Sequence, residues 1–432
     1  MGAKKQTVMA PRKIGSRLRL PAIVLSALVL FSGSALVLFS GEVLAHGERA
    51  QLASMRMRTV HWFDTQVTPL KAKVGDTVTL TGKFIPSTHW PETLPSIADT
   101  AFLNVGVPGP TFLRVHSEVN GVPMMRSTAF PLGKVYEYKV VMRARIPGRY
   151  HVHPLINVLD AGSLVGKGTW LEIDEADTDA PFVNEATLLT GETVDLETFG
   201  LSGVIGWHLV WIAMGVAYLL FWLVRKELFI PRFMRIRALG DDRANELLTR
   251  RDFVGSAIFF TLTLTIILTG YLWAEWKYPL TIPLQTGKVP VEGIEVPRGD
   301  LKIEVENASY KLEGRSLTIN AKMTNNGERP LRIDEFLTAN IRFVNPKVAE
   351  GKIVEGEEMV ARDGLTVSVD TINPGETKDV VIVASDTLWE QYRMTGLIDD
   401  PDSRFAGLLF YNDDQGKRYY QELGGSILPS FF

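Results

Sequence analysis

The sequence GVIGWHLVWIAMGVAYLLFWLV, at residues 203–224, contains no Asp, Glu, Lys or Arg, and neither does FVGSAIFFTLTLTIILTGYLW at residues 253–273. Each segment has about the 20 mostly apolar residues that an α-helix needs to cross the hydrocarbon core of a bilayer. Tryptophan and tyrosine cluster toward the segment ends, where their amphipathic rings favour the headgroup zone. The two segments therefore predict a membrane-spanning helical hairpin.

The loop between these segments, residues 225–252, carries eight Lys/Arg against five Asp/Glu. A short loop with such an excess of cations stays in the cytoplasm, so both flanking regions are predicted to face the periplasm or a lumen. Two buried helices of a soluble protein would explain neither this loop nor the N-terminus. The predicted location is the cell inner membrane or an intracytoplasmic membrane, with lipid around the helices.

The N-terminus, residues 1–45, has the features of a signal peptide. Six Lys/Arg precede an apolar run, and Val43-Leu44-Ala45 is typical of a cleavage site. Cleavage there would make His46 the first residue of the mature chain. The alternative is an uncleaved membrane anchor, because the apolar run approaches spanning length.

The regions on either side of the hairpin, residues 46–178 and 297–432, have the pattern of β-sandwiches. Short alternating segments are separated by turn residues, as at Pro147-Gly148 and Asn373-Pro374-Gly375-Glu376. The predicted fold class is mainly β, with two sandwich domains joined by two transmembrane helices and with linkers at residues 179–202 and 274–296. Strands are predicted at residues 135–145, 150–158, 301–306, 316–324, 340–345, 365–369 and 378–384.

Composition excludes several kinds of site. The chain has no cysteine, which rules out disulfides, thiolate zinc sites, iron–sulfur clusters and a His-Cys blue-copper site, so any metal site must use nitrogen and oxygen. Beyond residue 45 there are 40 Lys/Arg against 48 Asp/Glu, a balance that opposes a nucleic-acid partner. The segment GSLVGKGT, at residues 162–169, is similar to a phosphate-binding loop but lacks the Ser/Thr directly after Lys167.

Histidine placement is the most informative feature of the sequence. Six of the seven histidines lie at or before residue 153, and His151 and His153 are at positions i and i+2 of a predicted strand. Two such side chains project from one face about 7 Å apart along the strand, which suits a shared metal ion and also fits an ordinary polar strand edge. A mature N-terminal His46 would add an α-amine and a third imidazole. This nitrogen set suits Cu(II).

Six sequence blocks follow one another along the chain and together carry a family resemblance. They resemble the B subunits of the copper membrane monooxygenases, the family of particulate methane monooxygenase and ammonia monooxygenase, over essentially the whole mature chain. The blocks are HGERAQ at 46–51, MRMRTVHWFD at 55–64, ARIPGRYHVH at 144–153, LTGETVD at 189–195, YPLTIPLQ at 278–285 and DPDSRF at 400–405.

The resemblance implies a fold, partners and an activity. The two sandwiches would be cupredoxin-like and periplasmic, and the chain would assemble with the monooxygenase A and C subunits, with three such units in a ring. The complex would use copper and O₂ to oxidise a very small substrate. The TVHW, YHVH and DSRFAG segments resemble methane-oxidising members more closely, so methane is the expected substrate and ammonia the alternative. A second hypothesis gives this chain only a copper-holding, scaffolding role, with the active site in the C subunit.

The resemblance also implies copper ligands. In the family, the copper site of the B subunit is formed by the N-terminal histidine and the H-x-H pair, which here are His46, His151 and His153. A second, variable site pairs the histidine of the R-T-x-H-W block, here His61, with a histidine after Gly-Lys-Phe. Ile85 stands at that position, so the second site is expected to be weak or missing unless His89 takes part.

Overall fold

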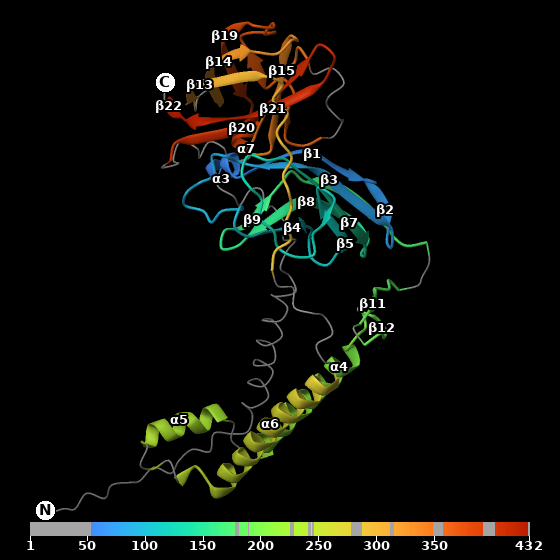
Figure 1. Ribbon diagram of the computed structural model, residues 1–432. Coiled ribbons are helices and arrows are strands. Elements are labelled where there is room, and N and C mark those ends of the chain that lie inside the picture. The colour runs from blue at the N-terminus through green and yellow to red at the C-terminus, as the bar shows by residue number, and fades with distance from the viewer. Residues whose placement is uncertain are drawn as a thin grey trace, which may run out of the picture.

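The computed structural model contains two stacked β-sandwiches and a pair of long helices, and the first sandwich lies between the second one and the helices (Figure 1). The predicted fold class is confirmed. The predicted signal peptide and His46 lie outside the part of the chain that the structure describes. That part comprises residues 53–177, 181–188, 190–224, 229–240, 243, 246–277, 287–311, 315–348, 357–391 and 402–430.

Two sheets form the first sandwich, in the orders β1-β3-β7-β5-β6 and β2-β10-β8-β4, with β9 paired to β8. The alternation of Val78, Leu80 and Phe84 along β3 buries all three side chains in the core between the sheets. The strands are β1 Val60–Thr68, β2 Lys71–Lys73, β3 Thr77–Pro86, β4 Ala101–Gly106, β5 Phe112–Val119, β6 Val122–Pro123, β7 Tyr136–Ala144, β8 Gly148–Val158, β9 Gly162–Val165 and β10 Thr169–Asp174.

The second sandwich has the sheets β18-β19-β14-β13-β22 and β17-β16-β15-β20-β21. Leu317, Ile319, Ala321 and Met323 alternate along β14, and all four are buried in its core. The elements are β13 Leu301–Lys311, β14 Ser316–Asn325, β15 Leu331–Thr338, β16 Ile341–Val344, β17 Val360–Ala361, β18 Leu365–Val367, β19 Thr377–Ser385, α7 Leu388–Gln391, β20 Arg404–Asp413, β21 Arg418–Ser426 and β22 Leu428–Ser430.

The two sandwiches are packed against each other through an apolar interface. The helix α3, Ala53–Arg58, precedes the first sandwich, yet its Met57 is fully buried in the core of the second. Burial of apolar surface stabilises this contact. A separate cluster between them consists of Phe63, Ile85, Val135, Leu337, Leu408, Phe410 and Tyr420.

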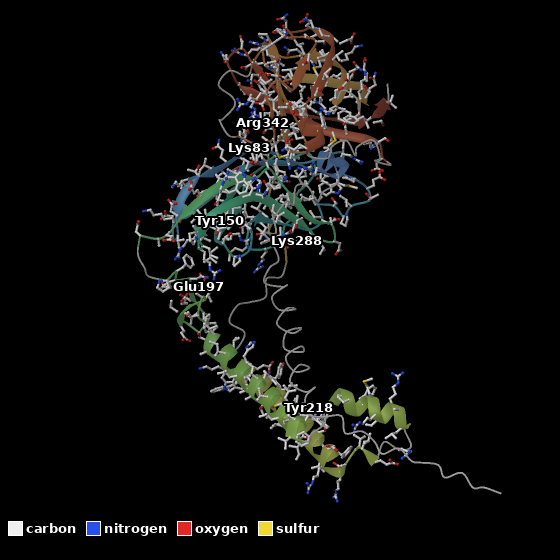
Figure 2. All side chains as sticks on the ribbon, turned by 180° about the vertical axis from the view of Figure 1, so that it is seen from behind. Lys83, Tyr150, Glu197, Tyr218, Lys288 and Arg342 are labelled. Atoms are coloured by element: carbon white, nitrogen blue, oxygen red, sulfur yellow. The ribbon has the colours of Figure 1, made fainter. Side chains whose placement is uncertain are left out.

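The segments predicted as linkers also bind the first sandwich. The segment after the first sandwich includes the hairpin of β11, Glu185–Thr187, and β12, Thr193–Asp195. Beyond the hairpin, Glu197, which is labelled in Figure 2, pairs with Arg145 of the first sandwich. On the return, Val291 enters the first core, and Ile294 pairs with Val135. Parts of both predicted linkers are therefore packed on the first sandwich.

The helical pair consists of α4, Leu201–Val224, and α6, Arg250–Lys277, both long and apolar enough to cross a membrane. A Cβ atom on Gly255 would lie 2.2 Å from the ring of Phe221, so this glycine allows the two helices to approach closely. The structure adds a helix that the sequence patterns did not predict, α5 at Phe229–Leu239, within the cationic loop.

Candidate metal centre

The two histidines of the H-x-H pair lie side by side on β8. Their ring centroids are 4.4 Å apart with the planes at 84°. Val152, between them, points the other way into the core of the first sandwich, as strand alternation requires. His153 is only 3% exposed, and the side chain of His151 is 15% exposed. The pair is therefore a largely desolvated two-imidazole unit at the strand's outer face.

The segment 166–168 forms a strap against the two rings. A Cβ atom on Gly168 would lie 2.4 Å from Cε1 of His153 and 2.6 Å from Cε1 of His151. Only glycine leaves room for both imidazoles there, because real Cβ atoms do not approach other atoms so closely. The pattern GSLVGKGT, which is not a phosphate loop, contributes this strap to the histidine site.

Gly166, at the start of the strap, fixes the orientation of His153. Nδ1 of His153 lies 3.1 Å from the carbonyl oxygen of Gly166, and since a carbonyl only accepts, Nδ1 carries the proton. The lone pair is then on Nε2, the state in which an imidazole binds a metal. A Cβ on Gly166 would collide with the ring of Trp62, so the TVHW block supports the strap from below.

His151 lies between the two sandwiches. Its ring packs against Trp170 of the neighbouring strand β10, with centroids 4.7 Å apart, and its Nε2 lies 3.2 Å from Oε2 of Glu358. Glu358 belongs to the second sandwich, and its other oxygen accepts a hydrogen bond from Nε1 of Trp170 at 2.9 Å. The second sandwich therefore contributes a carboxylate directly beside the H-x-H pair.

These features fit a copper ion as far as the described residues go. Two imidazoles converge, one has its Nδ1 proton fixed by a backbone carbonyl, and a glycine keeps the space beside them open. Within the described part of the chain, no group of three or more His, Asp or Glu side chains is placed to hold a metal. The remaining predicted ligand, His46, lies outside that part.

The other predicted pair, His61 and His89, is placed beside β21 of the second sandwich. His61 is 2% exposed, and its Nε2 lies 2.9 Å from Oε1 of Glu422. The residue opposite His61 across the β1–β3 ladder is Ile85, which belongs to the apolar cluster between the sandwiches. His61 is thus a hydrogen-bonded residue beside Trp62. Ile85, at the position where the family can have a second histidine, packs between the two sandwiches.

Glu422 is held as a carboxylate at this interface. Burial by itself would raise its pKa, but the bond and charge of His61, with bonds from Ser87 and Thr88, outweigh burial and lower the pKa to about 2. Burial lowers the pKa of His89, whose ring lies against Gly424 of β21. His89 is therefore disfavoured as a cation next to the interface.

We expect Glu422 to make docking of the sandwiches sensitive to acid. A carboxyl with a depressed pKa stabilises the fold above its ordinary value, 4.5, and loses that contribution as pH falls toward about 2. The shift corresponds to about 3 kcal/mol. The unfolding free energy of the full chain in detergent, relative to Glu422→Gln, should fall by about that amount between pH 5 and pH 2. Parallel pH profiles for the two proteins would contradict this assignment.

A charge network, whose side chains are 4–19% exposed, crosses the interface next to the histidines. Lys167 of the strap and Arg342 of β16 both bind Oε1 of Glu357, at 2.5 Å and 2.6 Å. Arg342 also binds Oε2 of Glu335, at 3.0 Å, and Figure 2 shows Arg342 where the two sandwiches meet. Burial would raise the pKa of Glu357, but Lys167 and Arg342 together lower it. The network ties the strap to the second sandwich.

The site residues that the sequence patterns did not reveal are Gly168, Trp170 and Glu358. Two glycines close together among strands, at 166 and 168, are a signal of close backbone approach that could have pointed to the strap. The sequence holds no signal for Glu358, since it meets His151 only through the docking of two domains. The remaining described histidines have local partners: His116 pairs with Glu118 at 3.0 Å, and His208 bonds the carbonyl of Val204 at 2.8 Å.

Comparisons with known proteins show one family. The sequence model of the B subunits of monooxygenases matches residues 47–431. A protein described as the particulate methane monooxygenase alpha subunit of Methylococcus capsulatus (Bath) is 41% identical over 389 residues, which cover 90% of this chain and 92% of that protein. Among solved structures, the cupredoxin domain of AmoB from Nitrosocaldus yellowstonii aligns with 31% of this chain and 95% of its own, at 17% identity and a TM-score of 0.24.

Proposed function

Because this chain belongs to the monooxygenase B-subunit family, as one member of a membrane monooxygenase complex, we propose that it is the copper-holding subunit of an enzyme that oxidises methane to methanol with O₂. The observation that supports copper holding is the pair of converging, desolvated imidazoles of His151 and His153 under the glycine strap. Methane as the substrate is supported by the Methylococcus relative, whose name states methane.

The proposed ligands are His151, His153 and the amine and imidazole of His46, after removal of residues 1–45. Copper held there would supply the chemistry of O₂ binding and reduction. The chain's own residues prepare the site: Gly166 sets the proton of His153, Gly168 leaves space for both rings, and the surrounding sandwich excludes bulk water.

The test is made on the purified complex that contains this chain. We expect it to convert methane to methanol, to lose this activity when a chelator removes copper, and to regain it when Cu²⁺ is returned. A preference for ammonia over methane in direct competition would establish the alternative substrate. Full activity in a complex whose copy of this chain holds no copper would reduce the chain to a scaffold, with the active site in a partner.

The arrangement in the membrane is also proposed. The outer faces of α4 and α6 are apolar and exposed, as at Leu209, Leu219, Phe260 and Leu268, which suits lipid and the partner A and C subunits in a trimer of such units. The two sandwiches, residues 46–178 and 297–432, would lie on the periplasmic side. The cationic loop at residues 225–252 would lie in the cytoplasm.

Limited proteolysis tests this topology. A protease added to sealed, inverted membrane vesicles should cut only within residues 225–252, because the sandwiches would be enclosed in the vesicle lumen. Right-side-out vesicles serve as the control and should show the reverse pattern. Cleavage within residues 301–432 in the inverted vesicles would overturn the two-span arrangement.

A further inference from the structure

The carboxylate of Glu358 lies at the H-x-H pair, between Trp170 and His151. Trp170 donates to Oε1 at 2.9 Å, and Oε2 lies 3.2 Å from Nε2 of His151. The preceding residue, Glu357, is anchored by Lys167 and Arg342. The following residue, Met359, has a left-handed backbone (φ 55°) and a buried side chain. This turn sends Met359 into the second core while both glutamates face the first sandwich.

The chemistry of the proposed ligands indicates why a carboxylate would be needed beside them. Imidazoles and an amine are neutral donors, so a divalent ion bound by them in a half-buried place keeps its whole charge, which is costly without a nearby anion. Histidines that bind metals also commonly offer their second ring nitrogen to a carboxylate or a backbone carbonyl, which orients the ring and raises its basicity. Nδ1 of His153 faces the carbonyl of Gly166 in this way, and Nε2 of His151 lies at ion-pair distance, 3.2 Å, from Oε2 of Glu358, so Nδ1 of His151 would be the nitrogen that binds copper.

We propose that Glu358 is a positioning residue of the copper site: from the second sandwich, it orients His151 and supplies the negative charge that the all-nitrogen ligand set lacks. This inference rests on the proposed copper site. It also gives the second sandwich a part in metal binding, although that domain contains no histidine. Copper is then held well only when the two sandwiches are docked.

The test substitutes the carboxylate by its uncharged isostere in the full chain. In Glu358→Gln the amide oxygen can still accept from Trp170, so a purely structural role would survive. We expect copper affinity, measured by competition with a chelator of known affinity, to fall about 10- to 100-fold. The Cu(II) electron paramagnetic resonance spectrum should also shift its g values and copper hyperfine splitting. Glu358→Asp, which keeps the charge, should lose less affinity than Glu358→Gln.

The matched control is Glu172→Gln, which removes an exposed carboxylate from the same strand as Trp170 and should change neither quantity. Wild-type affinity and an unchanged spectrum in Glu358→Gln would overturn this inference alone, provided that copper in the unsubstituted protein still depends on His151 and His153. If copper does not depend on those two residues, the proposed site itself fails, which separates the two outcomes.

Discussion

The double substitution His151→Ala/His153→Ala should remove copper from this chain. Two of the four proposed nitrogen donors are lost, and the effect should far exceed the roughly 10- to 100-fold weakening that follows loss of a residue behind the ligands. Copper content per chain should fall accordingly, and the nitrogen hyperfine pattern of any remaining Cu(II) signal should change. Both rings lie at the outer face of β8, so the core residue Val152 keeps its place and the strand should still form.

The controls for this experiment are two histidines with other partners. His116 pairs with Glu118 on β5, and His89 lies against Gly424, so His116→Ala and His89→Ala should each leave copper in place. The full chain is required, because an excised first sandwich would lose its contacts with the second, including the packing of Met57 in the second core. Mass spectrometry of the same sample should find His46 as the first residue. Full copper with unchanged hyperfine structure in the double variant would show that the H-x-H pair is an ordinary strand edge.

Local patterns in the sequence predicted most of the fold. The apolar segments 203–224 and 253–273 became α4 and α6, which are two and seven residues longer, because hydrophobic length is a property of the segment alone. The alternation of apolar and polar residues, which is also a local property, predicted β8 and β14 correctly. The strand predicted at residues 301–306 continues to Lys311, because pairing with β14 and β22 extends it beyond its own pattern.

The features that the sequence patterns could not reveal are contacts between distant segments. Glu358 meets His151 across more than 200 positions of the chain, and Arg58 binds Asp402, at 2.7 Å, across 344. Sequence periodicity contains no information on such long-range contacts. In the sequence, each of these charged residues looks like an ordinary surface residue. The pairing of Arg58 with Asp402 also joins the MRMRTVHWFD and DPDSRF blocks, which lie far apart in the sequence.

The substitution Arg342→Met should strongly destabilise the docked sandwiches. It removes the cation that Glu335 and Glu357 share, and Glu335 is only 3% exposed. Burial would lower the pKa of Arg342, but its bonds to the two glutamates raise it. The interactions with the glutamates therefore outweigh the cost of desolvating the guanidinium. Removing one partner of a largely buried ion pair costs up to about 3–5 kcal/mol. Here Glu335 would keep only the more distant Arg418, at 3.9 Å, while Glu357 would keep Lys167, so most of the loss is expected at Glu335.

Urea unfolding of the detergent-solubilised chain, followed by the β-sheet signal in circular dichroism, measures this loss. The matched control is Arg329→Met, whose pair with Asp414 at 2.9 Å is exposed and should cost at most about 1 kcal/mol. Adding Glu335→Gln to Arg342→Met should recover part of the lost stability, because the uncharged side chain at position 335 no longer needs the guanidinium and Glu357 keeps its pair with Lys167. If Arg342→Met and Arg329→Met cost the same, the network contributes no more than a surface ion pair. In that case, the apolar cluster around Phe63 and Phe410 would hold the sandwiches together without it.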